Sequence, residues 1–198
     1  YHYKGEVVNT PSFELELHEE LPLDVTDSEE EISIKSGELT LVITKKNWSM
    51  TYYRNGEMIT RSAGRDLALM KTDFKGFAYN DTDAEETYMR QMLSLSVGEL
   101  VYGTGERFTP FVKNGQSIDI WNADGGTSTE QSYKNIPFFI TNKGYGVLVN
   151  HPEKVSIEVA TEMVTRTEFS VPGGYLDYFL INGPTMKEVL TRYTDLTG

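Results

Sequence analysis

The chain has 198 residues, and its 30 acidic against 18 basic side chains leave a formal net charge of −12. Such a negative surface repels phosphate backbones and anionic lipids, so we expect neither nucleic acid nor a membrane as a partner. Hydrophobic residues make up 38% of the chain and aromatic residues 12%, which excludes wholesale disorder and suits packed β-sheets.

In the first half of the chain, apolar and polar residues alternate over residues 32–34, 39–43 and 48–52. A period of two predicts strands with one buried face. Ser36-Gly37 separates the first two strands, and Asn55-Gly56 is the strongest short hairpin signal. The acidic stretches 27–31 and 81–86 predict solvated loops.

The second half of the chain repeats the same pattern, with turn residues at 142–144 and 172–174. Alternation predicts strands over residues 93–97, 118–120, 136–140, 145–149, 155–159 and 169–171. The run from Tyr175 to Ile181 is apolar on both faces, which predicts a strand in the middle of a sheet.

The C-terminal segment predicts the only convincing helix. Thr185 and Glu188 form a capping box after Gly183-Pro184. Apolar side chains then recur at helical spacing, and Gly198 lies near the expected end. Ten or more short strands followed by one helix predict an all-β antiparallel sandwich, and no linker divides residues 1–198 into separate domains.

The chain contains no cysteine, which excludes disulfides and thiolate chemistry within it and favours a cytoplasmic location. Its three histidines, His2, His18 and His151, are far apart in sequence. A zinc site would need carboxylates to complete it, so we expect no metal site and no cofactor. No apolar run reaches about 18 residues, so we expect no membrane-spanning segment.

Two glycine-containing segments resemble a dinucleotide-binding loop and a calcium-binding loop, but each lacks residues that such a loop requires. Gly103-Thr104-Gly105 fails as a dinucleotide fingerprint because Phe108 occupies the third glycine position. We predict a tight turn at a strand end, with Glu106 and Arg107 paired or capping backbone groups. Residues 122–126 resemble half a calcium loop, but the EF-hand register places Ile120 and Gln131 at the ligand ends.

The segment 121–131, Trp-Asn-Ala-Asp-Gly-Gly-Thr-Ser-Thr-Glu-Gln, is a polar loop with an aromatic residue at its root. Sugar binding uses this mixture, because carboxylates and amides bond hydroxyls while an aromatic face packs on ring C–H groups. An ordinary loop of Asx turns has the same composition, so chemistry alone leaves both interpretations open. The 30 acids make paired carboxylates plentiful and uninformative.

Several blocks of the chain carry a family resemblance. Residues 102–108, Tyr-Gly-Thr-Gly-Glu-Arg-Phe, resemble the Tyr-Gly-x-Gly-Glu-Arg-Phe block of glycoside hydrolase family 31. Residues 121–131 are similar to the next block in the bacterial α-xylosidase branch. Further matching blocks follow in order at 133–139, 144–152, 183–185 and 192–194. The resemblance is close from about residue 93 and traceable from about residue 32.

The resemblance implies an N-terminal domain with a galactose-mutarotase-like antiparallel β-supersandwich fold and one C-terminal helix. A catalytic (β/α)8 barrel with both catalytic aspartates would follow residue 198, so we expect no catalytic residue in this chain. In the family, a loop of this domain reaches over the barrel mouth. The loop after Trp121 is similar to that family loop, so the resemblance implies that Asp124 contacts a sugar hydroxyl. Asn122 and Thr127 are weaker substrate-binding candidates. We expect Glu106 and Arg107 to have structural roles.

These implications favour a part of a retaining α-xylosidase, whose partners would be the barrel of the same polypeptide and an α-linked xyloside or glucoside oligosaccharide. An α-glucosidase of the same family is the runner-up. An autonomous carbohydrate-binding module and a sugar epimerase acting through the sandwich remain as alternatives. The oligomeric state of the parent, a homo-oligomer included, and the extent of its sequence on either side are left open.

Overall fold

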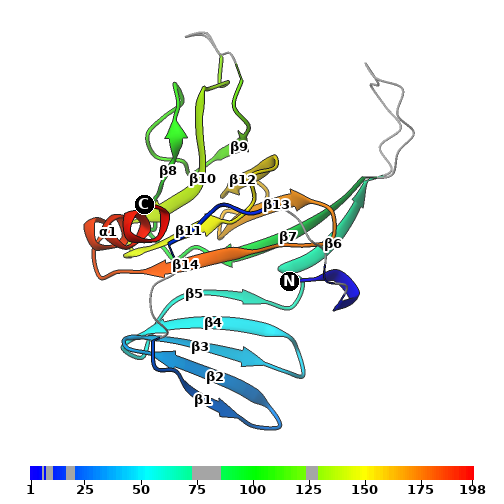
Figure 1. Cartoon of the computed structure of the whole chain (residues 1–198), viewed down its shortest axis with the longest axis vertical. Coiled ribbons are helices and arrows are strands. Elements are labelled where there is room, and N and C mark those ends of the chain that lie inside the picture. The colour runs from blue at the N-terminus through cyan, green and yellow to red at the C-terminus, as the bar shows by residue number, and fades with distance from the viewer. Residues whose placement is uncertain (6, 8–10, 17–20, 73–85, 124–128) are drawn as a thin grey trace.

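The computed structural model describes residues 1–5, 7, 11–16, 21–72, 86–123 and 129–198. Within these residues the chain forms three antiparallel sheets and one α-helix (Figure 1). The elements are a 3₁₀ turn at Tyr3–Gly5, β1 Asp24–Asp27, β2 Glu31–Ser36, β3 Leu39–Thr44, β4 Ser49–Arg54, β5 Glu57–Ala63, β6 Leu67–Thr72, β7 Glu86–Ser94, β8 Val101–Glu106, β9 Gln116–Ile120, β10 Lys134–Thr141, β11 Tyr145–Val149, β12 Val155–Val159, β13 Arg166–Pro172, β14 Tyr178–Asn182 and α1 Met186–Thr197.

The N-terminal sheet is a meander in the order β1-β2-β3-β4-β5. Its hairpins follow the predicted turns: Asn55 and Gly56 both adopt positive φ (50° and 84°), as a type I′ turn requires. The sequence pattern missed β1, whose four residues are all exposed and pair with β2. The predicted loop at 27–31 is therefore shorter than expected, because its first residue belongs to β1 and its last to β2.

The other two sheets have the orders β6-β7-β13-β12-β9 and β14-β11-β10-β8. Hydrogen bonds from Thr60 Oγ1 to Ser94 O (2.9 Å) and from Arg61 N to Ser94 Oγ (3.0 Å) join β5 to β7. The two five-stranded sheets therefore adjoin, and both contribute to the core that the four-stranded sheet covers. This arrangement confirms the antiparallel sandwich predicted from the alternating pattern.

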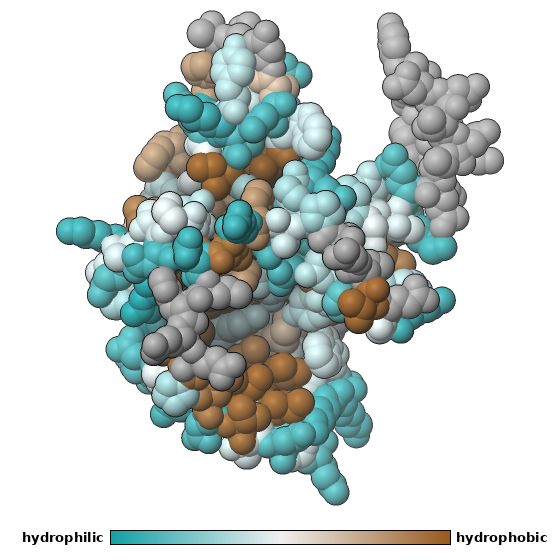
Figure 2. Space-filling model, in the orientation of Figure 1, coloured by the Kyte–Doolittle hydropathy of each residue, from teal (hydrophilic) through white to brown (hydrophobic). Residues whose placement is uncertain are grey.

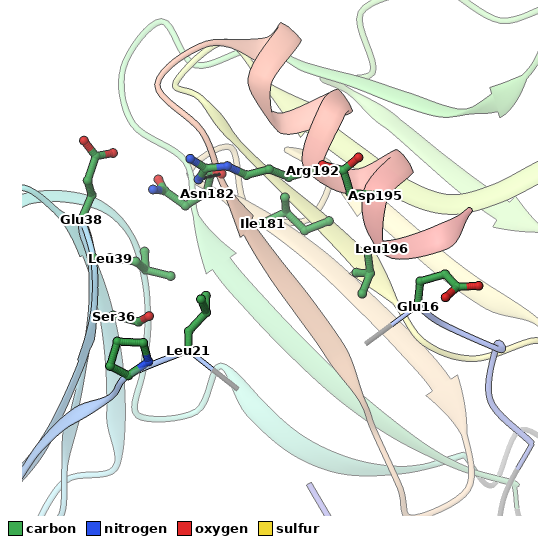
Figure 3. A pocket seen from close by; sticks show the side chains of 12 residues that line it. Glu16, Leu21, Ser36, Glu38, Leu39, Ile181, Asn182, Arg192, Asp195 and Leu196 are labelled. Carbon is green, nitrogen blue, oxygen red and sulfur yellow. Dashed lines mark hydrogen bonds between the residues drawn. The ribbon is translucent and has the colours of Figure 1, made fainter. Parts of the chain in front are cut away.

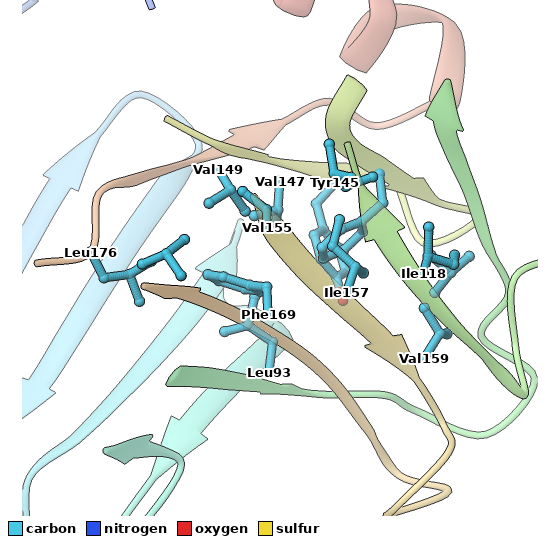
Figure 4. Packing of buried hydrophobic residues seen from close by; sticks show 14 of the residues in the cluster. Leu93, Ile118, Tyr145, Val147, Val149, Val155, Ile157, Val159, Phe169 and Leu176 are labelled. Atoms are coloured by element: carbon cyan, nitrogen blue, oxygen red, sulfur yellow. The ribbon is translucent and has the colours of Figure 1, made fainter. Parts of the chain in front are cut away.

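The main core lies between the sheets (Figure 4). Phe139 and Tyr145 of the four-stranded sheet and Phe169 of the opposing sheet are fully buried, and the rings of Phe139 and Phe169 lie 6.4 Å apart. Val97 departs from the prediction. β7 ends at Ser94, and Val97 is 100% exposed in the following turn, where Glu99 accepts the N–H of Ser96 (2.8 Å).

The run 175–181 corrects a second prediction. β14 is an edge strand, because only β11 pairs with it among the described strands. Both of its faces are nevertheless apolar, since Tyr178 and Leu180 pack on the main core while Phe179 and Ile181 pack under α1. β14 therefore has the main core on one face and α1 on the other, and its apolar pattern reflects these two layers rather than strands on both of its edges.

Helix α1 confirms the predicted capping box. Thr185 Oγ1 accepts the backbone N–H of Glu188 (3.3 Å), and Gly198 caps the C-terminal end with a φ of 88°. Val189 is buried, and the ring of Tyr193 stacks on Phe138 at 4.0 Å. This single helix of the described chain has twelve residues and is neither long nor apolar enough to cross a bilayer.

Candidate functional site

The sugar-contact residues expected from the sequence belong to the loop between β9 and β10. Asp124 and Thr127 lie outside the described residues, so their role stays a prediction. Asn122 is exposed and forms an isolated β-bridge with Ser132. The two residues lie at opposite ends of the loop, so the bridge joins these ends. The backbone N–H of Ala123 also donates to Ser132 O (3.0 Å).

Asn135, at the start of β10, holds the root of this loop. Its backbone N–H and its Nδ2 both donate to Asn122 Oδ1, at 2.9 and 3.1 Å. Its Nδ2 also lies 2.8 Å from the carbonyl oxygens of Trp121 and Ser132. The side-chain oxygen of Asn122 therefore already accepts two hydrogen bonds from Asn135 at the base of the loop. The sequence motif contained Asn135, but no local signal assigned it this role.

Arg107 ties the same root to the rest of the domain. Its guanidinium donates to the carbonyl oxygens of Thr104 (3.3 Å), Glu130 (3.3 Å) and Asp119, and to Asn135 Oδ1. Burial lowers the pKa of Arg107, and Glu130 and Asp119 oppose this effect. The group nonetheless stays charged, since arginine does not deprotonate in proteins. The prediction that Arg107 caps backbone groups is confirmed.

Glu106 lies beside this network and contributes less to it. Its carboxylate pairs with Lys134 Nζ at 3.1 Å, but both side chains are about three-quarters exposed. An exposed ion pair of this kind is worth about 0–1 kcal/mol. The backbone of Glu106 has the larger role, because its carbonyl oxygen accepts the hydroxyl of Ser132.

The glycines before Arg107 do not form the predicted strand-end turn. Gly103, Thr104 and Gly105 all lie within β8, with φ values of 107°, 69° and 89°. Strand β10 approaches so closely that a Cβ at Gly105 would clash with the carbonyl oxygen of Lys134 and lie 3.0 Å from Asn135 Cα. The β8–β10 register shifts at this point, which marks a bulge. Bulges re-aim side chains, and this one directs Arg107 toward the loop root.

Aromatic side chains surround the same end of the molecule. Trp121 and Tyr133 flank the loop and are 58% and 62% exposed. Phe108 and Phe111, in the connection between β8 and β9, are also largely exposed. Exposed aromatic side chains of this kind are common at interaction sites.

We expect Arg107→Ala to lower the free energy of unfolding by about 2 kcal/mol or more, because the substitution removes several charge-assisted hydrogen bonds at once. Arg107→Lys keeps the charge but cannot supply the same fork of donors, so it should recover less than half of the loss. Urea denaturation measures both values. Arg61→Ala removes an exposed arginine from β5 and serves as the control; an equal loss in that variant would contradict the role of Arg107.

A second polar cluster lies on β13 and its neighbours. Burial raises the pKa of Glu168 to about 7, Arg90 opposes the shift, and Glu158 and Glu162 add to it. Arg90 Nη1 lies 3.8 Å from the Glu168 carboxylate. This is a titratable carboxylate of the kind that the epimerase alternative requires, but the adjoining cavity holds only about 10 Å³. Small-molecule sites usually need about 300 Å³ or more.

Two of the three histidines come together in space. The rings of His2 and His151 lie 4.6 and 5.3 Å from the ring of Tyr175. His151 Nε2 accepts the backbone N–H of Asp177 (3.0 Å), so this nitrogen is engaged in the fold. Among the described residues no group of three or more histidine, aspartate or glutamate side chains could hold a metal ion.

The fold is an antiparallel β-sandwich with one C-terminal helix, and the loop between β9 and β10 is anchored to its sheets. Residues 1–158 match the family model of the glycosyl hydrolase 31 N-terminal galactose mutarotase-like domain, and the chain belongs to this family. The family resemblance carried by the sequence motifs is thereby confirmed.

Relatives agree with this assignment. The chain is 44% identical to the alpha-xylosidase XylQ of Lactiplantibacillus pentosus over 95% of its own length and 24% of that protein. It is 62% identical to an alpha-xylosidase of Emericella nidulans over 56% of its length and 14% of that protein. It thus spans a quarter or less of these curated relatives.

A solved structure supports the fold. The α-xylosidase of this family from a soil metagenome, complexed with xylose, superposes with a TM-score of 0.74 at 16% identity, covering 98% of this chain and 29% of that one.

Proposed function

We propose that this chain is the non-catalytic N-terminal domain of a retaining α-glycosidase that hydrolyses α-xylosidic bonds. The observation that carries the proposal is the 44% identity to an alpha-xylosidase along 95% of the chain. A retaining mechanism needs two carboxylates about 5–5.5 Å apart across the glycosidic bond. We assign that pair to a (β/α)8 barrel elsewhere in the same polypeptide, and we treat residues 1–198 as one domain that packs against it.

The domain's contribution would be to brace the barrel and to lend it the loop between β9 and β10. Arg107 and Asn135 support this role, because they fix both ends of the loop to the sheet. The exposed rings around the root would then face the barrel. Asp124 is the proposed contact to a sugar hydroxyl, and Asn122 and Thr127 are weaker candidates.

A second candidate has one observation in its favour. The exposed rings of Trp121 and Tyr133 are surfaces on which a sugar could stack without any barrel. This arrangement would suit an autonomous carbohydrate-binding module. An α-glucosidase of the same family is the runner-up, since the pocket that separates xylose from glucose would lie in the barrel.

We expect the isolated chain, once shown to be folded by circular dichroism, to cleave neither an aryl α-xyloside nor an aryl α-glucoside. The reason is that the proposed catalytic pair lies outside it. Release of the aryl group, followed by absorbance, measures the activity. Turnover that disappears in Glu168→Gln would contradict the proposal, because Glu168 is the described carboxylate with a pKa suited to acid–base chemistry.

A further inference from the structure

The chain contains the dipeptide Asn-Gly at residues 55–56, 114–115 and 182–183. Asparagine loses its side-chain amide most readily before glycine, because glycine has no side chain to shield its own backbone nitrogen. That nitrogen attacks the asparagine Cγ, so the reaction requires a glycine N–H without an acceptor and an asparagine side chain that can move. The three pairs differ in both respects.

The pair at 114–115 is held by hydrogen bonds on both residues. The N–H of Gly115 donates to Val159 O (2.7 Å). Asn114 is half-buried; its Oδ1 accepts the N–H of Val101 (2.9 Å), and its Nδ2 donates to Glu99 O (3.0 Å). Attack on Asn114 would require all three of these hydrogen bonds to break.

The pair at 182–183 is protected by burial. Asn182 is 7% exposed and lies next to Arg192 of α1 (Figure 3). The N–H of Gly183 donates to Gly144 O (3.0 Å), and a Cβ on Gly183 would lie only 2.7 Å from Val189 N. Attack on Asn182 would therefore require the connection between β14 and α1 to open.

The pair at 55–56 has neither form of protection. Both residues are exposed in the two-residue turn that joins β4 to β5. No residue in the described part of the chain accepts the N–H of Gly56. The Asn55 side chain has a weak contact from its Nδ2 to Glu38 Oε1, at 3.4 Å. The attacking nitrogen and the side chain that it attacks are thus both accessible.

We propose that Asn55 is a site of spontaneous deamidation and that its isoaspartyl product loosens the N-terminal sheet from the rest of the domain. The Gly56 nitrogen loses its proton and bonds to Asn55 Cγ, and the Cγ–Nδ2 bond breaks to release ammonia. Water then opens the cyclic imide at either carbonyl and returns a proton to the nitrogen, which leaves aspartate or isoaspartate. The net reaction is hydrolysis of the side-chain amide by water.

The preceding residue explains why the isoaspartyl product would matter. Arg54 Nη1 donates to the carbonyl oxygens of Gly144 (2.8 Å) and Gly183 (2.9 Å), and its Nη2 donates to Lys143 O (2.9 Å). These bonds fasten the end of β4 to the β10–β11 turn and to the connection before α1. Isoaspartate adds a methylene to the backbone of the β4–β5 turn, which displaces Arg54 from these acceptors.

The two layers stand apart beside these hydrogen bonds. A hollow of about 800 Å³ lies between them, and Leu39 faces Ile181 and Leu196 across it (Figure 3). Figure 2 shows a broad hydrophobic surface over the N-terminal sheet. Arg54 therefore joins the layers at a place where their apolar faces have not closed on each other.

The first test is peptide mapping by mass spectrometry of the full-length protein after incubation in mildly alkaline buffer. In the folded protein, Asn55 should convert at least about 10-fold faster than Asn114 or Asn182, because those two react only after a local opening that breaks hydrogen bonds. In guanidinium chloride the three should convert at similar rates. Similar rates in the folded protein, no conversion of folded Asn55, or a preference for Asn55 that persists in denaturant would overturn the proposal.

The second test measures the loosening by amide hydrogen exchange in the full-length protein. After separation of the isoaspartyl form, the Gly183 N–H should exchange at least about 10-fold faster in it than in fresh protein. Asn55→Asp adds the charge without lengthening the backbone and should match fresh protein, while Asn55→Gly keeps the turn and should show no conversion at residue 55. Unchanged exchange in the isoaspartyl form, or an equal increase in Asn55→Asp, would overturn the effect assigned to the longer backbone.

Discussion

Gly105→Ala in the full-length protein is expected to reduce the free energy of unfolding by about 4 kcal/mol or more, or to prevent folding of the domain. The new Cβ would clash with the Lys134 carbonyl oxygen and lie 3.0 Å from Ile136 N, and the φ of +89° disfavours any L side chain. Backbone on both sides leaves no flexible side chain to move away, so β8 and β10 must separate. Urea denaturation and the yield of soluble protein measure the effect.

Gly115→Ala is the matched control for this prediction. Its φ of +84° is nearly the same, but nothing lies within 4 Å of the added Cβ. Only the left-handed backbone conformation is then penalised, at about 1 kcal/mol. Equal losses in the two variants would show that close packing of β8 on β10 adds nothing to the requirement for glycine.

In the full-length enzyme, Asp124→Ala is expected to lower kcat/KM on an α-xylosyl disaccharide about 10- to 100-fold while leaving thermal stability unchanged. A carboxylate bonded to a sugar hydroxyl in a water-excluded site contributes about 1.5–3 kcal/mol. That energy converts to the stated loss in kcat/KM. Steady-state kinetics on the disaccharide and a thermal melt are the two measurements.

Glu130→Ala removes a negative charge from the same loop and is the control for Asp124. Glu130 accepts a hydrogen bond from Arg107 through its backbone carbonyl, which the substitution keeps, and its side chain makes only a charge interaction with Arg107, so its loss should matter little to kcat/KM. Wild-type kinetics in Asp124→Ala would reduce the loop to a structural element. Sub-millimolar sugar binding by the isolated chain, abolished by Asp124→Ala, would instead favour an autonomous binding module.

Local chemistry explains why much of the fold could be predicted from the sequence. Asn55-Gly56 specifies its hairpin because both residues tolerate positive φ. Thr185 specifies the start of α1 because its hydroxyl oxygen accepts the N–H of Glu188 and donates to the Glu188 carboxylate. Alternating apolar residues define which face of a strand is buried. The ordered motifs along the chain were sufficient to place it in its glycosidase family.

The tertiary structure decided the features that depend on neighbours distant in sequence. The apolar run at 175–181 predicted a central strand, but its second apolar face packs under α1 rather than between strands. Gly103 and Gly105 resembled a turn, and only the approach of β10 explains positive φ inside a strand. Arg107 donates to Thr104 in the preceding strand, but its other acceptors, in Asp119, Glu130 and Asn135, are 12 to 28 residues away in sequence. A residue pattern encodes which face is buried, whereas the partner across that face, or along an open edge, depends on how the sheets assemble.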